Sequence, residues 1–360
     1  MTIQMDILEK IKQAGLVGRG GAGFLVAKKW SAVKDAAGDP SASSPRPELG
    51  TKAGQVKKYV VCNAAEGEPG LVKDSYILEH HADKVIDGMK IAINFLSVGS
   101  EKNKPAVKGY IFLNHAYNKK LNKKLAALLK DSAIEIFIKP IESGYIGGEE
   151  SAVLNAIEGR RIEPRLKPPF PVTHGLWGFP TLVNNVETFY NVNLVNSDQY
   201  KNNRFYDIAG DCPNEGVYEL PADLTIEKVL KETKNYPKFP FFAQVGGDMA
   251  GEVLSSRQLK GPATGAGSIT VFSLAKNNYK KIITGWLDFF ADESCGQCTP
   301  CREGTYRLRE VFMEEKIDWV LFNDLLDNLA DASFCALGGS VVVPIRSFMK
   351  NVLPEMEAKK

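Results

Sequence analysis

The sequence lacks several features that would fix its class at once. No apolar run reaches the roughly 18 residues of a membrane-spanning helix, so we expect a soluble protein without direct membrane insertion. A formal net charge of +2 gives no general attraction to nucleic acid. Six cysteines in 360 residues are too few for a disulfide framework, and the first 15 residues are charged where an export signal is apolar. These absences favour a cytoplasmic protein whose thiols stay free for metal or chemistry.

Three of the six cysteines lie close together in ESCGQCTPCREGT (293–305). Cys295, Cys298 and Cys301 form C-x2-C-x2-C, a spacing that holds iron–sulfur cubanes with a fourth cysteine from elsewhere. Cys335 is the best fourth candidate, because it lies at a Gly-containing break between two helical patterns. Zinc is the main alternative, although none of the four histidines lies near this loop, and three unliganded thiols are the other. We expect the four cysteines to ligate a 4Fe-4S cluster.

A glycine-rich stretch, GRGGAGF (18–24), follows a short helical pattern near the N-terminus. Gly18, Gly20 and Gly23 match G-x-G-x-x-G, but the dinucleotide fingerprint requires a preceding strand, so an ordinary Rossmann site is not indicated. The glycines do let backbone N–H groups approach a phosphate or an aromatic cofactor closely. We expect an anion cradle here, and a mobile loop tip is the alternative.

Strand and helix patterns alternate in the next part of the chain. Strand-like runs at 59–64, 110–113 and 134–138 are separated by apolar residues at helical spacing. This alternation predicts a parallel sheet with helices on its faces, whose ligands bind beyond the carboxyl ends of the strands. Two motifs lie at such ends, NAAEGEPG (63–70) and SGYIGGEESAV (143–153).

Both motifs place glutamates beside glycines. Glu66 and Glu68 lie in a Gly/Pro turn without a helix start to cap, and such a turn can aim carboxylates at ribose or ribityl hydroxyls. Glu149 and Glu150 are predicted in the first turn of a helix, where capping is the alternative to ligand binding. Farther along, GLWGFPTLVNNVET contains a pair of asparagines, whose amides can both donate to and accept from a polar heterocycle.

Together these motifs resemble those of a known family. GRGGAGF, NAAEGEPG, GYIGGEES, RLKPPFP, GLWGFPTLVNNVET and ESCGQCTPCREGT, in this order, are similar to motifs of the NADH-binding flavoprotein subunit of respiratory complex I and of its relatives in NAD-linked hydrogenases and formate dehydrogenases. The resemblance covers nearly the whole chain. It implies an NADH dehydrogenase-type enzyme that binds FMN, takes hydride from NADH and passes electrons singly to a 4Fe-4S cluster.

The resemblance also assigns roles to single residues. The implied cofactor-binding residues are Gly18, Arg19, Gly20, Gly21, Ala22, Gly23, Phe24, Asn63, Glu66, Glu68, Tyr145, Gly148, Glu149, Glu150, Lys167, Phe170, Asn184 and Asn185. Among them, Lys167 and Phe170 are implied contacts of the dinucleotide, and the asparagine pair is implied to contact FMN. No residue is assigned as a catalytic acid or base, because hydride transfer to the flavin needs orientation above all.

Four positions depart from the family pattern. Ala65 replaces an aspartate and Gly67 a serine in the second motif, which removes two polar contacts to FMN. Ala32 stands where relatives often have an aromatic residue that stacks on adenine, and Gly147 replaces a cysteine common in the third motif. We therefore expect a more weakly held flavin and a modest affinity for NADH.

The expected fold class is α/β with three domains. A parallel Rossmann-like FMN and NADH domain spans 1–198. Strand-like runs around one helical pattern predict a small β-grasp domain at 199–275, which resembles the soluble-ligand-binding type and for which a spacer role is favoured. A C-terminal helical bundle that carries the cluster spans 276–360.

The expected function is that of an NADH-oxidising subunit of a multi-subunit oxidoreductase. NAD(H) is the substrate, and the resemblance implies a 2Fe-2S thioredoxin-like partner and further iron–sulfur subunits. The expected location is the cytoplasm or the cytoplasmic face of a membrane complex. Two alternatives stay open: the same fold with another donor or with NAD(P)+ reduction, and a non-catalytic electron relay or assembly subunit. The sequence does not decide between NADH and NADPH.

Overall fold

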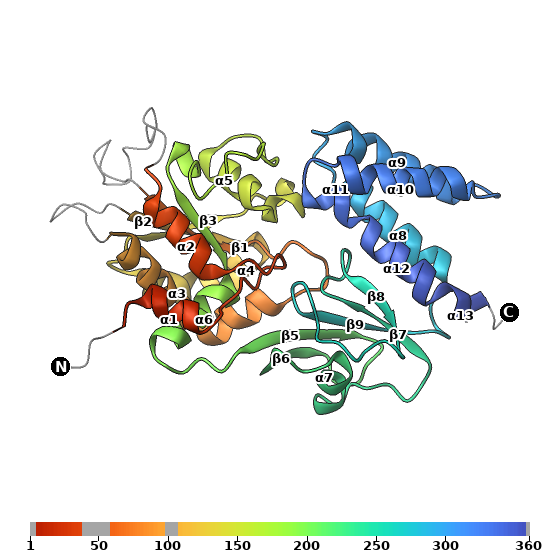
Figure 1. The fold of residues 1–360 in the computed structure, drawn as a ribbon, viewed down its shortest axis with the longest axis horizontal. Helices are drawn as coiled ribbons and strands as arrows, with labels where there is room; N and C mark the ends of the chain where they lie inside the picture. The colour runs from red at the N-terminus through yellow and green to blue at the C-terminus, as the bar shows by residue number, and fades with distance from the viewer. Residues whose placement is uncertain (1–4, 38–57, 98–106, 358–360) are drawn as a thin grey trace. The chain divides into compact units, whose positions relative to one another are not determined.

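The computed structural model describes residues 5–37, 58–97 and 107–357 (Figure 1). The chain folds into two compact units. The first comprises Met1–Gly67 and Asp74–Asn202, and the second comprises Glu68–Lys73 and Asn203–Lys360. The segment 68–73 thus belongs to the second unit, although its neighbours along the chain belong to the first. Among the described residues, no helix is both long and apolar enough to cross a membrane.

A parallel four-stranded sheet forms the centre of the first unit, in the order β3-β2-β1-β4. Its strands are β1 (Lys58–Ala64), β2 (Val107–Leu113), β3 (Ile134–Ile138) and β4 (Thr181–Asn185). The three predicted strands are confirmed. β4 was not predicted, because this run is short and ends in two asparagines, which are rare in strands.

Helices precede and connect the strands of the first unit, and they surround its sheet (Figure 1). They are α1 (Ile7–Gln13), α2 (Val26–Asp35), α3 (Lys73–Ser97), α4 (His115–Leu129), α5 (Glu150–Glu158) and α6 (Val186–Asn196), with short 3-10 helices η2 (Ile141–Ser143), η3 (Ile146–Gly148) and η4 (Leu176–Gly178). β2 is buried along its whole length, as is typical of a central parallel strand. Tyr59, Phe112 and Leu154 belong to one buried cluster that joins the sheet to α5. The first unit is therefore the α/β layer structure that the alternating pattern predicted.

A mixed five-stranded sheet forms part of the second unit, in the order β6-β5-β9-β7-β8. Its strands are β5 (Asn203–Gly210), β6 (Gly216–Pro221), β7 (Phe241–Val245), β8 (Glu252–Ser255) and β9 (Ser268–Ser273). The helix α7 (Ile226–Glu232) lies between β6 and β7 in the chain. Only β5 and β9 pair in parallel. One helix packed on a mixed sheet agrees with the expected β-grasp-type module, to which the structure adds β8.

Six helices follow this sheet in the second unit. They are α8 (Tyr279–Asp292), α9 (Thr299–Met313), α10 (Trp319–Ala332), α11 (Ala336–Ser340), α12 (Val342–Asn351) and α13 (Leu353–Glu357). α12 covers the edge strand β8: Ser347 Oγ accepts from the Val253 N–H at 2.8 Å, and Asn351 Nδ2 donates to the Val253 carbonyl at 2.8 Å. The helix thereby satisfies backbone groups that an open sheet edge would leave unpaired. The predicted helical bundle is confirmed, and it packs directly on the β-grasp-type sheet.

Candidate functional site

The glycine-rich loop links α1 to α2 and closes on itself. Its ends are joined where the Gly18 N–H donates to the Phe24 carbonyl at 2.8 Å. Gly21 and Gly23 have φ of 114° and 62°, and a Cβ built on either would meet nothing within 4 Å. Phe24 is 57% exposed. The loop therefore offers open backbone and a free aromatic ring, which fits a cradle for an aromatic cofactor or its phosphate.

The same loop approaches the carboxyl end of β4. A Cβ on Gly20 would lie 3.1 Å from the Cβ of Asn185, so this position has room for little more than glycine. Asn185 in turn caps α6, because its Oδ1 accepts from the Glu187 N–H, and its Nδ2 donates to Asp74 at 2.6 Å. Since Asn185 lies opposite Asn63 in the register of β1 and β4, the loop meets the ends of two neighbouring strands.

Two predicted cofactor residues point their side chains into the protein. Arg19 is 6% exposed, and its guanidinium contacts Asn202 at 3.3 Å. Asn184 is also buried, and in the amide orientation that satisfies both of its groups it accepts from Trp30 Nε1 at 3.1 Å and donates to the Val183 carbonyl. Both side chains stabilise the walls of the site, so their contribution to cofactor binding stays a prediction.

The second motif follows β1 and is tied to the third. Asn63 Nδ2 donates to the Gly148 carbonyl at 2.8 Å. Glu66 accepts hydrogen bonds from the Asp74 and Ser75 N–H groups at the start of α3, and from the Tyr117 hydroxyl. Burial, reinforced by the charge of Asp74, raises the pKa of Glu66 to about 7 although these hydrogen bonds oppose the shift. The expectation that Glu66 has no helix start to cap is wrong.

Glu68, the next acidic residue of this motif, belongs to the second unit. Its Oε1 accepts from the Met249 and Ala250 N–H groups at 2.6 and 3.0 Å. Burial raises the pKa of this carboxyl, and the nearby charge of Asp248 adds to the shift. The structure thus gives Glu68 backbone partners that the sequence did not suggest.

Two glutamates of the third motif form ion pairs with two lysines. Glu149 caps α5 by accepting from the Ser151 and Ala152 N–H groups, and it pairs with Lys167 Nζ at 2.6 Å. Glu150 pairs with Lys29 Nζ from α2 at 2.5 Å. Burial opposes ionisation of Glu149, but the hydrogen bonds from Lys167 and Ser151 and the charge of Lys167 outweigh it and lower the pKa. The predicted helix start is confirmed, and Lys29 is a neighbour that no motif indicated.

Aromatic and small residues flank this group. Phe170 is 53% exposed, so like Phe24 it leaves a ring open to a planar ligand. Ala32 lies on the exposed side of α2, three residues after Lys29. Lys139, which directly follows β3, is only 5% exposed. Lys139 was not predicted to belong to the site, because one lysine between a strand and a proline carries no motif.

The cysteine loop joins α8 to α9 in the second unit. Cys298 is the N-cap residue of α9, Cys335 is the N-cap residue of α11, and Cys301 lies buried in the first turn of α9. Burial raises the pKa of Cys301 to about 11, and the charges of Cys298, Cys335 and Cys295 add to the shift, which places all four thiols in one neighbourhood. A Cβ on Gly338 would come within 3.2 Å of Cys301 Cβ, so the turn after Cys335 packs closely on the loop.

This arrangement is compatible with a cubane cluster. No three His, Cys, Asp or Glu side chains of the described ranges surround a single metal position. A 4Fe-4S cluster does not require such a group, because each of its irons takes one cysteine. Cys62 lies buried in β1 of the first unit, and Cys212 lies two residues after the end of β5 in the second unit. The assignment of the four cluster ligands therefore remains a prediction from the sequence.

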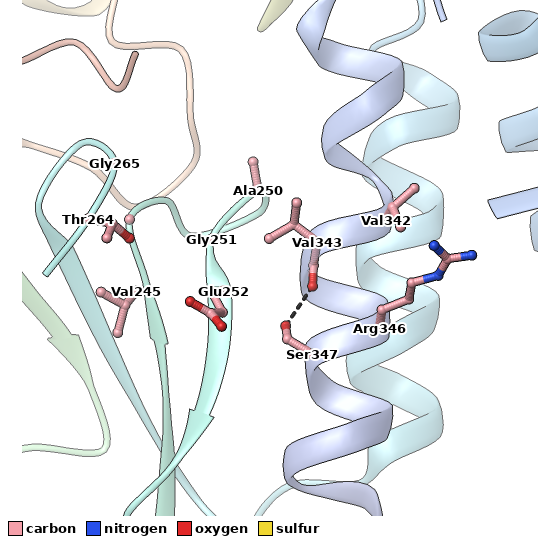
Figure 2. A pocket seen from close by; sticks show the side chains of 11 residues that line it. Val245, Ala250, Gly251, Glu252, Thr264, Gly265, Val342, Val343, Arg346 and Ser347 are labelled. Atoms are coloured by element: carbon pink, nitrogen blue, oxygen red, sulfur yellow. Dashed lines mark hydrogen bonds between the residues drawn. The ribbon is translucent and has the colours of Figure 1, made fainter. Parts of the chain in front are cut away.

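A separate pocket of about 440 Å³ opens in the second unit (Figure 2). Its lining residues come from the ends of β7 and β8, the loop before β9, and α12. They include Ala250, Glu252, Val343, Arg346 and Ser347. None of the predicted site residues lines it, so the candidate site is defined by the motifs and not by this cavity.

Two family models match the chain. The Nuo51 FMN-binding domain matches residues 11–194, and the NADH-ubiquinone oxidoreductase-F iron-sulfur binding region matches residues 281–359. The NADH-quinone oxidoreductase F subunit of Buchnera aphidicola subsp. Schizaphis graminum is 32% identical over 98% of this chain and 84% of the relative. This chain belongs to the family of NADH-quinone oxidoreductase F subunits. A second relative, the NADH-quinone oxidoreductase F subunit 2 of Rhizobium meliloti, is 30% identical over 98% of this chain and 88% of the relative.

The chain is also similar to hydrogenase subunits. The alpha subunit of NAD-reducing hydrogenase HoxS in Cupriavidus necator is 32% identical over 99% of this chain, which spans 60% of that protein. A crystal structure of an NAD+-reducing NiFe hydrogenase in the H2-reduced state matches with a TM-score of 0.82 and 28% identity, over 98% of this chain and 62% of that chain. Membership of the F-type family confirms FMN and a 4Fe-4S cluster as the cofactors and an NADH dehydrogenase type of enzyme.

Proposed function

We propose that this chain oxidises NADH through FMN bound in the first unit and passes electrons to a 4Fe-4S cluster bound by Cys295, Cys298, Cys301 and Cys335. The observation that carries the proposal is the meeting of three motifs at the carboxyl ends of β1 and β4. The glycine-rich loop reaches Asn185, and Asn63 is bonded to Gly148. In parallel α/β sheets this edge is where ligands bind.

The residues of the first unit supply binding and orientation. Gly21 and Gly23 leave backbone open to the flavin, while the exposed rings of Phe24 and Phe170 can stack on the planar parts of a dinucleotide. When bound, FMN accepts a hydride and releases single electrons. Orientation is therefore the main contribution of the chain, and no side chain needs to move a proton in the hydride step.

The two lysine–glutamate ion pairs supply polar groups that can bind a nucleotide or flavin. Lys167 is held by Glu149, and Lys29 by Glu150. Lys167 can turn from Glu149 to a dinucleotide phosphate, while the carboxylates accept from ribose or ribityl hydroxyls. Their ion pairs hold these side chains in position before the ligand arrives.

The wider assembly follows from the chemistry of a one-electron cluster. The relatives are named as subunits, which supports a place for this chain in a larger complex. We propose that the next carrier is a 2Fe-2S thioredoxin-like subunit and that further iron–sulfur subunits come after it. We place the chain in the cytoplasm or peripherally at the cytoplasmic face of a membrane complex.

The test begins with the cluster in anaerobically purified protein. Changing Cys335 to Ala is expected to remove most of the cluster absorbance and iron, whereas Cys62→Ala, in the buried strand β1, is expected to leave both intact. One zinc per chain without iron would contradict the assignment. Gly21→Val is expected to release flavin and leave the cluster in place, because a β-branched residue does not tolerate a φ of 114°.

The donor is tested by separate anaerobic titrations with NADH and NADPH. We expect NADH to bleach the flavin absorbance with a modest affinity. Ala32→Phe is expected to tighten NADH binding about fivefold, since one aromatic stacking contact is worth on the order of 1 kcal/mol. If neither nucleotide bleaches a flavin that is bound, the chain receives electrons from a protein partner, which is the relay alternative.

A further inference from the structure

A buried hydroxyl group without a hydrogen-bond partner lies beside the cysteine loop. Ser333 is the C-cap residue of α10 and precedes Cys335 by two residues. Its Oγ atom is buried, and no group within the described ranges forms a hydrogen bond with it. Burying a hydroxyl without a hydrogen bond is unfavourable. The Ser333 hydroxyl therefore fits a site whose acceptor belongs to a bound group.

Gly338 shows where this hydroxyl lies relative to the cysteine loop. A Cβ built on Gly338 would clash with Ser333 Oγ and would lie 3.2 Å from Cys301 Cβ. Ser333 Oγ and Cys301 Cβ thus approach the same point, next to the Cα of Gly338. Cys301 lies in the first turn of α9, and Cys335 is the N-cap residue of α11. The unsatisfied hydroxyl is therefore close to two of the four predicted cluster ligands.

A second hydroxyl contacts one of these cysteines directly. The Cys301 Sγ–H donates to Ser294 Oγ at 3.3 Å, and the Gly296 N–H donates to the same oxygen at 3.4 Å. Ligation of iron requires the thiolate form of cysteine, which has no hydrogen to donate. The contact with Cys301 then persists only if the Ser294 hydroxyl rotates and donates to the sulfur. Both serines can therefore act as donors to a cluster held by the four cysteines.

We propose that the Ser333 and Ser294 hydroxyls donate hydrogen bonds to sulfur atoms of the 4Fe-4S cluster and raise its midpoint potential. The proposal rests on the proposed cluster ligands. Hydrogen bonds to the sulfurs are one of the factors that set the potential of such a cluster. One electron from the reduced flavin adds negative charge to the cluster, so these bonds stabilise the reduced state more than the oxidised state. The two serines thereby favour electron transfer to the cluster.

The experiment compares Ser333→Ala and Ser294→Ala with Ser340→Ala in anaerobically purified, cluster-replete protein. Ser340 is a matched control, because it is the last residue of α11 and its hydroxyl already donates to the Leu337 carbonyl at 2.9 Å. Iron content is measured first. The midpoint potential is then determined by a redox titration that follows the electron paramagnetic resonance of the reduced cluster.

The first two variants are each expected to shift the equilibrium towards the oxidised cluster about fivefold. This corresponds to a midpoint potential that is lower by about 40 mV in a one-electron couple. Ser340→Ala is expected to leave the potential unchanged. No new atom enters the protein in any of these variants, so the iron content should stay that of the wild type.

The hydroxyl hydrogens also provide a spectroscopic signature. Electron–nuclear double resonance spectra of the reduced cluster in H2O and in D2O report exchangeable hydrogens close to it. One exchangeable coupling is expected to disappear in Ser333→Ala and another in Ser294→Ala. Ser294→Thr keeps a hydroxyl at the same position and is expected to retain both the coupling and the wild-type potential.

Unchanged potentials and couplings in Ser333→Ala and Ser294→Ala would overturn the proposal, although the cluster assignment would stand. Loss of iron from either variant would also count against it, because a hydroxyl that tunes the potential is not needed to hold the cluster. An equal shift in Ser340→Ala would assign the effect to general packing around the loop. A wild-type protein without iron would instead overturn the proposed function.

Discussion

Changing Asp207 to Asn should stabilise the segment Glu68–Lys73 at pH 8 and have little effect at pH 3. This segment begins within the second motif and ends at the first residue of α3, and it belongs to the second unit. Asp207 lies on β5, is 4% exposed, and accepts a hydrogen bond from the Val72 N–H at 2.6 Å. Asparagine keeps an oxygen for that N–H and removes the charge, so the variant isolates the cost of ionisation.

The magnitude follows from the pKa of Asp207. Burial raises it from 3.8 to about 6, the charge of Asp248 adds to the rise, and the Val72 hydrogen bond and the charge of Lys73 oppose it. Because the folded state binds more protons than the unfolded state between these values, stability falls as the pH rises through this window. A shift of about two units corresponds to roughly 3 kcal/mol of lost stability above pH 6. We expect Asp207→Asn to recover about 1 to 3 kcal/mol at pH 8, less whatever its buried amide group costs.

Hydrogen exchange of the peptide that contains Val72 measures this effect locally, after correction for the intrinsic exchange rate at each pH. A local assay is needed because global unfolding of a chain with two units is not a single transition. Asp211→Asn is the control of opposite sign, since the hydrogen bond from the Ser273 N–H lowers the pKa of Asp211 and its ionised form stabilises the fold. Equal destabilisation by Asp207→Asn at pH 3 and pH 8 would refute the reasoning.

Two further substitutions test the packing and the charges of the first unit. Gly88→Ala should destabilise it by about 1 to 3 kcal/mol, measured by hydrogen exchange of α3, because the new Cβ would clash with the Phe189 carbonyl oxygen. Gly285→Ala in α8 meets nothing within 4 Å and should stabilise that helix by up to about 1 kcal/mol in the same assay. Glu149→Gln should destabilise at pH 7, and because the pKa of Glu149 is lowered, the difference from the wild type should vanish as the pH falls through that lowered value. A loss that persists at pH 3 would instead assign the effect to the cap hydrogen bonds.

Much of the fold could be predicted from local patterns. The three strands β1 to β3 and the helices that carry the cysteine loop have strong apolar periodicity, so they were found from sequence alone. β4 was missed because it ends in two asparagines, which are rare in strands: Asn185 caps α6 and lies against Gly20. Sequence rules fail at this edge because Asn185 ends a strand and caps a helix at the same time.

The roles of the acidic residues were harder to predict than their positions. Capping was considered for Glu149 and confirmed, because the helix start follows directly in the sequence. Glu66 caps α3 from seven residues before its first residue, and Glu68 accepts from Met249 and Ala250, far along the chain. Neither partner is visible to a local pattern, because both depend on how the turn after β1 leads into the second unit.

The departures from the family pattern also show what a sequence does not reveal about contacts between distant residues. In sequence, Ala65, Gly67 and Gly147 are three separate losses, and each suggests a weaker flavin site. In the structure they surround one region, since a Cβ on Gly148 would lie 3.5 Å from the Cβ of Ala65, and Lys139 reaches both Gly67 and Gly147. An alanine in place of an aspartate also removes a negative charge from this region. That change favours an anionic cofactor, so the missing polar side chains alone are a poor guide to flavin affinity in this chain.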